Sequence, residues 1–309
     1  MTLQLKGSIP ANVLPFDADL EIDEIQYRRH LAWLVDAGVD GITVNGHAAE
    51  VSSLSREEWG RALRIAVETI DGRVPVIAGI YAESHVEAAG LAREAEREGA
   101  DALLVFPPQA MLFDGPQDMA LRRYAALSDA VSIGLVAFIY PAWSRMQVAT
   151  DTLVRAIEAA NIIAIKEWSL DIQTYERNFR AMRSLARHVA VLTSFSASLL
   201  PSLAIGADGI LSGHGSVIAD LHGTLLRLVN GSEIAAARDL YARIQTLTRA
   251  IYRSPLVDMH TRMKEQLVML GRLDTAYVRP PLARVSDAER VALRRSLYEA
   301  ALLETAEVA

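Results

Sequence analysis

The chain has 309 residues and no cysteine, which excludes disulfide bonds and thiolate metal sites. It contains no apolar run near the ~20 residues that a membrane-spanning helix requires. Its first ten residues have too little apolar length for a signal peptide. The absence of cysteine is typical of reducing compartments. We therefore expect a cytoplasmic protein.

Positive charge is scarce as well. The net charge is −7 and the isoelectric point is near 5.6. No basic run is interleaved with aromatic residues, so nothing in the sequence favours binding to nucleic acid or to an anionic membrane. The chain is 51% hydrophobic and 22% charged, as soluble globular proteins are. Its length suits one large α/β domain with a small appendage, and the expected partner is a small molecule.

Lysine is rare among the basic residues: Lys6, Lys166 and Lys264 stand against 28 arginines. Lys166 ends the short apolar run 162–165, which is typical of a buried strand. Burial disfavours an ammonium group and so exposes a neutral amine, which can attack a carbonyl and form a Schiff base. Arginine stays protonated and cannot do this. The alternative is a solvated lysine paired with the adjacent Glu167.

Short apolar segments alternate with amphipathic segments eight times. The expected strands are 8–14, 41–44, 74–78, 102–106, 134–140, 162–166, 189–193 and 209–211. The expected helices are 23–37, 55–70, 84–98, 116–129, 150–160, 171–185, 197–205 and 216–229. Strict alternation predicts a parallel sheet, and eight units within about 230 residues predict a (β/α)₈ barrel. A doubly wound open sheet is the alternative, but no Gly-rich dinucleotide fingerprint follows the first strand.

The strand pattern stops after about residue 230. Residues 233–252, 256–270 and 287–304 have helical patterns, and 277–282 form a Pro-rich connector. We therefore expect a barrel over 1–230 and a C-terminal three-helix region over 231–309. No linker is rich enough in Gly, Ser or Pro to make that region an independent module.

Active sites of such barrels lie at the carboxyl ends of the strands. This rule selects His47 after the second strand, Tyr140 at the end of the fifth and Lys166 at the end of the sixth. It also selects Ser212 and His214 after the eighth. Because side chains alternate along a strand, a phenol at Tyr140 and the amine at Lys166 can face one substrate, with the phenol as proton shuttle.

Each candidate has a structural alternative. Tyr140 could simply cap the core, and His47 could be a loop histidine bonded to backbone. The glycines on either side of His214 fit a phosphate cradle or, equally, a tight turn. Glu50 fits best as a residue that satisfies backbone groups of its own turn.

The chain resembles the dihydrodipicolinate synthase / N-acetylneuraminate lyase family of class I aldolases. The resemblance extends nearly from end to end and includes 14–16, 46–50, 74–79 and the strand 162–167. It implies that Lys166 forms an imine with a 2-oxo acid, that no metal, nucleotide or flavin cofactor takes part, and that the chain assembles as a homotetramer, a dimer of dimers.

The departures from the family pattern concern acid–base and carboxylate-binding positions. His47 and Ala48 stand where the family has two hydroxyl-bearing residues, Phe138 stands in place of the strand-5 tyrosine, and Gln109 falls near the second relay tyrosine. These departures therefore indicate that the chain is not a true dihydrodipicolinate synthase. Tyr140, two positions after Phe138, faces the same side by strand parity and is the expected substitute.

Substrate recognition is expected to differ accordingly. Trp143, with Arg145 two residues beyond, falls where the family arginine binds a dicarboxylate substrate. The substrate carboxylate would instead bind backbone N–H groups of Ala48 and Ala49, with His47 as a further donor. The expected reaction is retro-aldol cleavage to pyruvate or dehydration of a 2-keto-3-deoxy sugar acid. The alternatives are a phosphate-binding barrel enzyme without an imine and a catalytically degenerate ligand-binding barrel.

Overall fold

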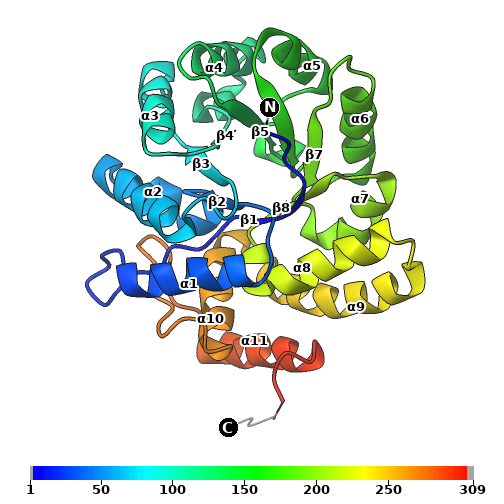
Figure 1. Cartoon of the computed structure of the whole chain (residues 1–309). Coiled ribbons are helices and arrows are strands. Elements are labelled where there is room, and N and C mark those ends of the chain that lie inside the picture. The colour runs from blue at the N-terminus through cyan, green and yellow to red at the C-terminus, as the bar shows by residue number, and fades with distance from the viewer. Residues whose placement is uncertain (1–2, 305–309) are drawn as a thin grey trace.

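The computed structural model describes residues 3–304, in which eight parallel strands alternate with eight helices (Figure 1). The strands are β1 (Gly7–Pro10), β2 (Ile42–Val44), β3 (Val76–Ile80), β4 (Ala102–Val105), β5 (Gly134–Ile139), β6 (Ile162–Glu167), β7 (Ala190–Thr193) and β8 (Gly209–Ser212). The surrounding helices are α1 (Glu24–Asp36), α2 (Arg56–Ile70), α3 (His85–Arg97), α4 (Asp118–Ser128), α5 (Thr150–Ala159), α6 (Ile172–Arg183), α7 (Leu199–Ile205) and α8 (Gly215–Asn230).

The eight strands form one sheet that closes on itself. β1 pairs with β8, and Ala11, just beyond β1, pairs with Thr43 of β2. The Asn12 N–H also donates to the Thr43 carbonyl (3.0 Å). Closure between β1 and β2 confirms the predicted (β/α)₈ TIM barrel, and the doubly wound open sheet is wrong.

Two strands differ from the prediction by more than one residue at an end, and the other six differ by a single residue. β1 ends at Pro10 rather than at residue 14, because the Val13 N–H donates to Ser216 Oγ (2.8 Å) instead of to a neighbouring strand. β3 begins at Val76 rather than at residue 74, because Pro75 has no N–H to contribute to the ladder. The predicted site residues lie at or after the carboxyl ends of β2, β4, β5, β6 and β8, all of which are within one residue of the prediction.

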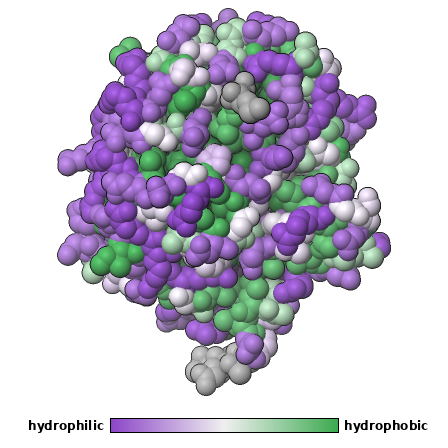
Figure 2. Space-filling view, viewed as in Figure 1, coloured by the Kyte–Doolittle hydropathy of each residue, from purple (hydrophilic) through white to green (hydrophobic). Residues whose placement is uncertain are grey.

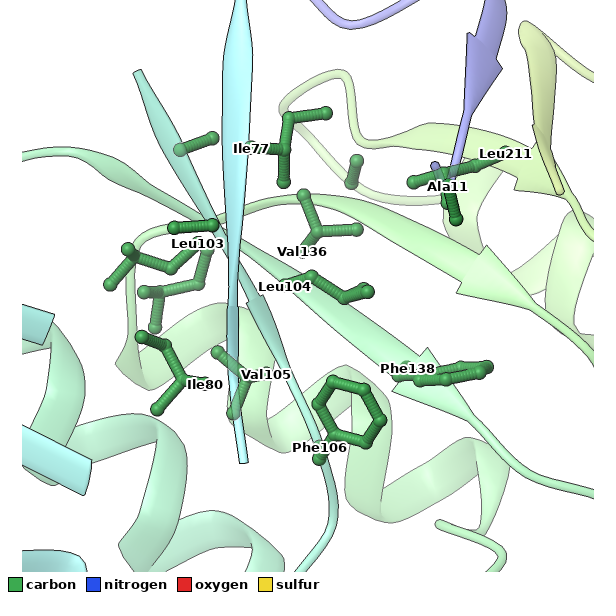
Figure 3. Close-up of a cluster of buried hydrophobic side chains, with 14 of the residues drawn as sticks. Ala11, Ile77, Ile80, Leu103, Leu104, Val105, Phe106, Val136, Phe138 and Leu211 are labelled. Carbon is green, nitrogen blue, oxygen red and sulfur yellow. The ribbon is translucent and has the colours of Figure 1, made fainter. Parts of the chain in front are cut away.

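Alternate residues of each strand point into the barrel. On β5 these include Val136 and Phe138, and Phe138 lies across from Lys166 in the register of β5 and β6. Figure 3 shows Phe138 near Phe106, which follows β4, and their ring centroids are 5.3 Å apart. Aromatic side chains therefore close the apolar core at the level of Lys166.

Three further helices follow the barrel: α9 (Ile234–Ile251), α10 (Met259–Met269) and α11 (Asp287–Glu299). α11 ends before the predicted residue 304, because Ala301 adopts a left-handed conformation (φ 54°). The three helices share a second apolar core with α7 and α8, which includes Leu203, Val217, Leu225, Leu240, Leu247, Met263 and Leu297. Since this core contains residues from both sides of residue 230, the division into 1–230 and 231–309 stays a prediction.

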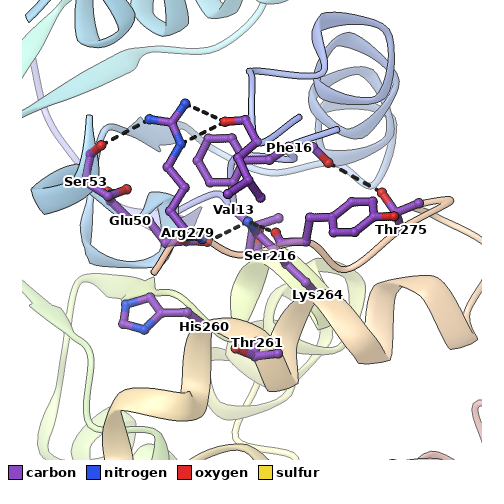
Figure 4. Close-up of polar contacts among 12 residues, drawn as sticks. Val13, Phe16, Glu50, Ser53, Ser216, His260, Thr261, Lys264, Thr275 and Arg279 are labelled. Carbon is purple, nitrogen blue, oxygen red and sulfur yellow. Dashed lines mark hydrogen bonds and ion pairs between the residues drawn. The ribbon is translucent and has the colours of Figure 1, made fainter. Parts of the chain in front are cut away.

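Buried charges tie the C-terminal region to the loop after β2 (Figure 4). Glu50 is 3% exposed and accepts hydrogen bonds from Lys264 Nζ (2.6 Å) and from the Arg279 backbone N–H (2.9 Å). Burial lowers the pKa of Lys264, and the Glu50 carboxylate opposes that shift. Lys264 and Arg279 also lie 4.3 and 4.4 Å from the centroid of the Phe16 ring. Glu50 thus links the strand-2 loop to α10, rather than satisfying its own turn.

Polar side chains cover most of the face seen in Figure 2, with apolar residues in patches among them. Within residues 3–304, no helix combines the length and the hydropathy needed to cross a bilayer. Nor does this part of the chain bring three or more histidine, aspartate or glutamate side chains together as a metal site requires.

Candidate active site

Lys166 lines a small cavity at the carboxyl ends of the strands, which we call the inner cavity. Its volume is about 30 Å³. Its walls are formed by Ala11, His47, Ala48, Phe138, Lys166, Trp168, Ser194, Gly213, Tyr252, Met259 and Met263. These residues come from strand ends, from the loop after β2 and from the C-terminal helical region. The cavity therefore lies where (β/α)₈ enzymes hold their reacting groups.

The Lys166 amine is buried and has no anionic partner. The residue is 3% exposed, and its Nζ lies 4.0 Å from the centroid of the Phe138 ring. Burial lowers the pKa of Lys166 to about 7, so a large fraction of the amine is neutral near neutral pH. Lys6 is exposed and Lys264 is paired with Glu50. In the described part of the chain, Lys166 is thus the one lysine that combines burial with an unpaired amine.

The adjacent Glu167 points away from Lys166. Successive strand side chains face opposite sides of the sheet, and the Glu167 carboxylate accepts hydrogen bonds from Asn178 of α6 (3.1 Å) and from the Ser169 N–H (3.3 Å). Burial raises the pKa of Glu167 to about 7, and these hydrogen bonds oppose the shift. The alternative of a solvated lysine paired with Glu167 is therefore wrong.

His47 and Tyr140 form a hydrogen-bonded pair beside the inner cavity. Nε2 of His47 is bonded to the Tyr140 hydroxyl. The rings of Tyr140 and Phe138 lie 4.6 Å apart, which agrees with the shared face predicted from parity. Burial, followed by the nearby His260 and Lys166, lowers the pKa of His47 to about 3. Burial also raises the pKa of Tyr140 well above its ordinary value, so both side chains are uncharged near neutral pH.

A second and larger cavity of about 410 Å³, the outer cavity, adjoins the first. Its walls are formed by His47, Val51, Ser52, Tyr81, Tyr140, Trp143, Ser144, Trp168, Leu256, Val257, Met259 and His260. His47, Trp168 and Met259 belong to the walls of both cavities. Trp143, which is 67% exposed, lies on the outer rim. The three shared side chains therefore lie at the boundary between the two cavities.

The loop after β2 places Ala48, but not Ala49, in the wall of the inner cavity. His47–Ala49 form a single 3₁₀ turn, in which the Ala49 N–H donates to the Gly46 carbonyl (3.2 Å). Ala48 lines the inner cavity, and Ala49 is buried outside its walls. Of the two amides predicted to bind the substrate carboxylate, that of Ala48 is the better placed.

Gln109 and Arg145 lie outside the walls of both cavities. Gln109 is exposed, and its side-chain amide donates to the Tyr81 hydroxyl. Arg145 is exposed as well, and its guanidinium lies 3.8 Å from the Asp114 carboxylate. Neither residue points its polar group at Lys166 in this structure.

In the turn Gly213–Gly215 after β8, Gly213 lines the inner cavity, whereas Gly215 packs closely against β1. A Cβ on Gly215 would come within 3.1 Å of Pro10, so a side chain there would collide with β1. His214 is fully buried, and its N–H donates to Ser212 Oγ (3.2 Å). Neither Ser212 nor His214 lines a cavity that contains Lys166. Of the two interpretations of this turn, the tight turn agrees better with the packing.

The sequence did not single out several wall residues. Trp168, two positions after Lys166, shares its strand face and could have been found by the same parity argument. Tyr252 and Met259 come from the end of α9 and the start of α10. Helical spacing does not say which helix meets the mouth of a barrel, so no sequence pattern could have placed them.

A cavity of about 600 Å³ lies at the opposite end of the barrel. Its walls come from residues 3–5 before β1, from the end of α5 and from the amino ends of β6 and β7. That end of a (β/α)₈ barrel contributes to stability, whereas reacting groups lie at the carboxyl ends. Its size therefore does not make it the candidate site.

The sequence matches a known enzyme family and named proteins over nearly its whole length. The model of the dihydrodipicolinate synthetase family matches residues 4–300. The chain is 31% identical over 294 residues to a 4-hydroxy-tetrahydrodipicolinate synthase of Thermomicrobium roseum, covering 95% of this chain and 94% of that one. It is 28% identical over 307 residues to the protein of the same name from Maridesulfovibrio salexigens, covering 98% and 100%.

Solved structures give the same result. A dihydrodipicolinate synthase from Bacillus anthracis is 28% identical and superposes with a TM-score of 0.87, covering 96% of this chain and 99% of that one. A prophage protein of the dihydrodipicolinic acid synthase family from Escherichia coli K12, solved in complex with pyruvate, is 24% identical with a TM-score of 0.90 over 97% and 100%. At that identity the second likeness shows the fold alone.

A closed (β/α)₈ barrel with these relatives defines an enzyme of the lyase class, of the class I aldolase type. The chain belongs to the dihydrodipicolinate synthetase family.

Proposed function

We propose that Lys166 forms a Schiff base with the ketone of a 2-oxo acid. The observation that supports this is a buried amine with a pKa lowered to about 7, without an anionic partner, in the wall of a cavity at the carboxyl ends of the strands. The neutral amine attacks the carbonyl, and the protonated imine then accepts electrons from a neighbouring bond. The reaction that follows is retro-aldol cleavage to pyruvate or dehydration of a 2-keto-3-deoxy sugar acid.

Residues of the two cavities have different roles in this proposal. The Ala48 N–H donates to the substrate carboxylate, with His47 beside it, and the Tyr140 hydroxyl passes the proton to and from the substrate. The inner cavity of about 30 Å³ has room for about two water molecules. A 2-oxo acid therefore extends into the outer cavity, and the shared wall of His47, Trp168 and Met259 has to yield when it binds.

Borohydride trapping tests the imine. Reduction in the presence of pyruvate is expected to add one pyruvyl mass to the peptide that contains Lys166. Only the neutral amine attacks, and its fraction grows ~10-fold per pH unit below the pKa, so the trapping rate should rise with pH up to about 7 and level off above it. Mass spectrometry over a panel of 2-oxo acids and a pH series measures both. An adduct on Lys6 or Lys264, or none with any 2-oxo acid, would contradict the proposal.

We also propose that this chain is not a true dihydrodipicolinate synthase. His47, Phe138 and Gln109 stand at the family's relay positions, and the Gln109 amide is engaged with Tyr81. Without the hydroxyl groups of the family's relay at these three positions, condensation of pyruvate with aspartate semialdehyde is expected to be at least ~10²-fold slower than in a relative with the full relay. A coupled assay measures it, with pyruvate trapping on the same sample as the control. A kcat near the ~10 per second that is typical of enzymes would show the proposal to be wrong.

Two other classes of function have weaker support. The phosphate-binding barrel needs an open glycine turn after β8, but Gly215 is packed against β1 and only Gly213 reaches a cavity, whose volume is about 30 Å³. A degenerate binding barrel would not need an amine at position 166. Burying Lys166 without a partner costs desolvation free energy that such a protein would have no reason to retain. Trapping with borohydride separates both from the lyase. The homotetramer and the cytoplasmic location stay predictions.

A further inference from the structure

The outer cavity is apolar, and its walls carry no formal charge near neutral pH. Its aromatic and aliphatic walls are Tyr81, Tyr140, Trp143, Trp168, Val51, Leu256, Val257 and Met259. The two histidines, His47 and His260, are neutral because burial lowers the pKa of each. No arginine, lysine, aspartate or glutamate is among the residues that line it in the described chain.

Most polar groups of these walls already have partners within the protein. The pairs are the Tyr140 hydroxyl with His47 Nε2, the Tyr81 hydroxyl with the Gln109 amide, His260 Nδ1 with the Val257 carbonyl (2.7 Å) and Ser144 Oγ with the Pro141 carbonyl (2.6 Å). A polyol or a carboxylate that entered the cavity would lose its water and find few free donors, such as the O–H of Tyr81, which only accepts in its pair with Gln109. An apolar group would lose little on entry and gain by burial.

The cavity also lacks a cation for a dicarboxylate substrate. Trp143 occupies the rim, and the nearby Arg145 lies outside the walls with its side chain 68% exposed, facing Asp114 at 3.8 Å. The volume of about 410 Å³ is within the ~300–1,000 Å³ range of small-ligand pockets. Size and chemistry together suit an aryl or a medium alkyl group.

We infer that the outer cavity binds an apolar, preferentially aromatic substituent, so that the carbonyl product or co-substrate of this lyase is an aryl or alkyl aldehyde. The inference rests on the proposed imine at Lys166. In cleavage, the C3–C4 bond of a 4-hydroxy-2-oxo acid breaks and its electron pair passes to the imine. The 4-hydroxyl loses its proton and becomes the aldehyde carbonyl, C3 takes up a proton, and water releases pyruvate. Addition is the reverse, and neither direction needs an oxidant or a reductant.

The test compares aldehydes of matched size in the addition of pyruvate. The probes are benzaldehyde, D-glyceraldehyde and succinic semialdehyde, for the aromatic, polyol and anionic classes. Since a pocket that fits one chemical class discriminates against a mismatched one by ~10²-fold, kcat/KM for benzaldehyde is expected to exceed both others by about that factor. Pyruvate trapping is measured on the same samples and reports the imine alone.

Trp143→Arg changes the chemistry of the rim without opening the core, because Trp143 is mostly exposed. It is expected to lower kcat/KM for benzaldehyde and to raise it for succinic semialdehyde, narrowing the preference at least ~10-fold. The matched control is Ile25→Arg, which adds the same charge at a residue that is 82% exposed on α1, away from both cavities. That control should leave all three values unchanged.

The outcomes separate the inference from the proposed function. Trapping with pyruvate but a preference for D-glyceraldehyde or succinic semialdehyde overturns the inference and leaves the imine standing. If no 2-oxo acid is trapped, the proposed imine is rejected. Ligand-observed NMR with benzyl alcohol and glycerol then tests whether the outer cavity binds an apolar group. Binding of benzyl alcohol that Trp143→Arg weakens, without binding of glycerol, supports the inference. No binding of benzyl alcohol, or equal binding of the two, overturns it.

Discussion

Replacing Lys166 with methionine is expected to abolish borohydride trapping with every 2-oxo acid and to lower turnover by ~10⁴-fold or more. Methionine fills the buried volume but has no nucleophile. Lys166→Arg is expected to fail as well, because a guanidinium stays protonated and cannot form an imine. Intact-mass measurement after reduction and initial rates with the trapped acid check both variants. Trapping that survives in Lys166→Met would locate the imine elsewhere.

The thermal stability of Lys166→Met shows whether a loss of activity comes from unfolding. Burial lowers the pKa of Lys166 from 10.5 to about 7 in the folded chain, so the folded chain holds this proton less tightly than the unfolded chain does. The free energy of unfolding therefore falls as the pH drops from about 10.5 towards 7, and the cost stays below that. Removing the amine removes the cost, so Lys166→Met should melt no lower than the native protein at neutral pH. Lys6→Met, at an exposed lysine, is the matched control and should keep full trapping.

Much of the fold could be predicted because its determinants are local. The apolar run before Lys166 forms β6 as expected, and parity alone places Lys166 inward and Glu167 outward. The glycines and caps that end each helix act within a few residues. Eight repeats of such a unit leave few ways to cover both faces of the sheet, so the barrel follows from the pattern.

Only the site residues that lie at the ends of strands could be predicted from the sequence. Lys264 forms a hydrogen bond with Glu50, which lies 214 residues earlier in the chain. The sequence around neither residue indicates that the two side chains meet. Tyr252 and Met259 reach the inner cavity because α10 packs against the strand-2 loop and α9 packs against the turn 196–198 after β7, a result of long-range packing. The apolar character of the outer cavity likewise depends on side chains that follow β3, β5 and β6 meeting the segment before α10 in space.

Tyr140→Phe is expected to slow turnover by ~10²- to 10⁴-fold, the usual effect of a positioned acid–base group. The Tyr140 hydroxyl lies at the border of the outer cavity and is bonded to His47, whose side chain lines the inner cavity as well. A phenol can donate one proton while accepting another, so it can pass a proton to the substrate without becoming ionised. This matters because burial raises the pKa of Tyr140 well above its ordinary value.

Two readouts distinguish a proton shuttle from a residue that only holds His47 in place. Trapping at Lys166 should survive in Tyr140→Phe at reduced speed, because attack on the ketone precedes the proton step that is lost. The pH–rate profile should show no break assignable to His47 near its ~6.5 reference value, since burial lowers that pKa to about 3. The control is Tyr124→Phe, a buried phenol on α4 without a hydrogen-bond partner in the described chain, which should turn over normally. Normal turnover in Tyr140→Phe would instead leave the proton to another group of the inner cavity, and Tyr252 is the remaining phenol in its wall.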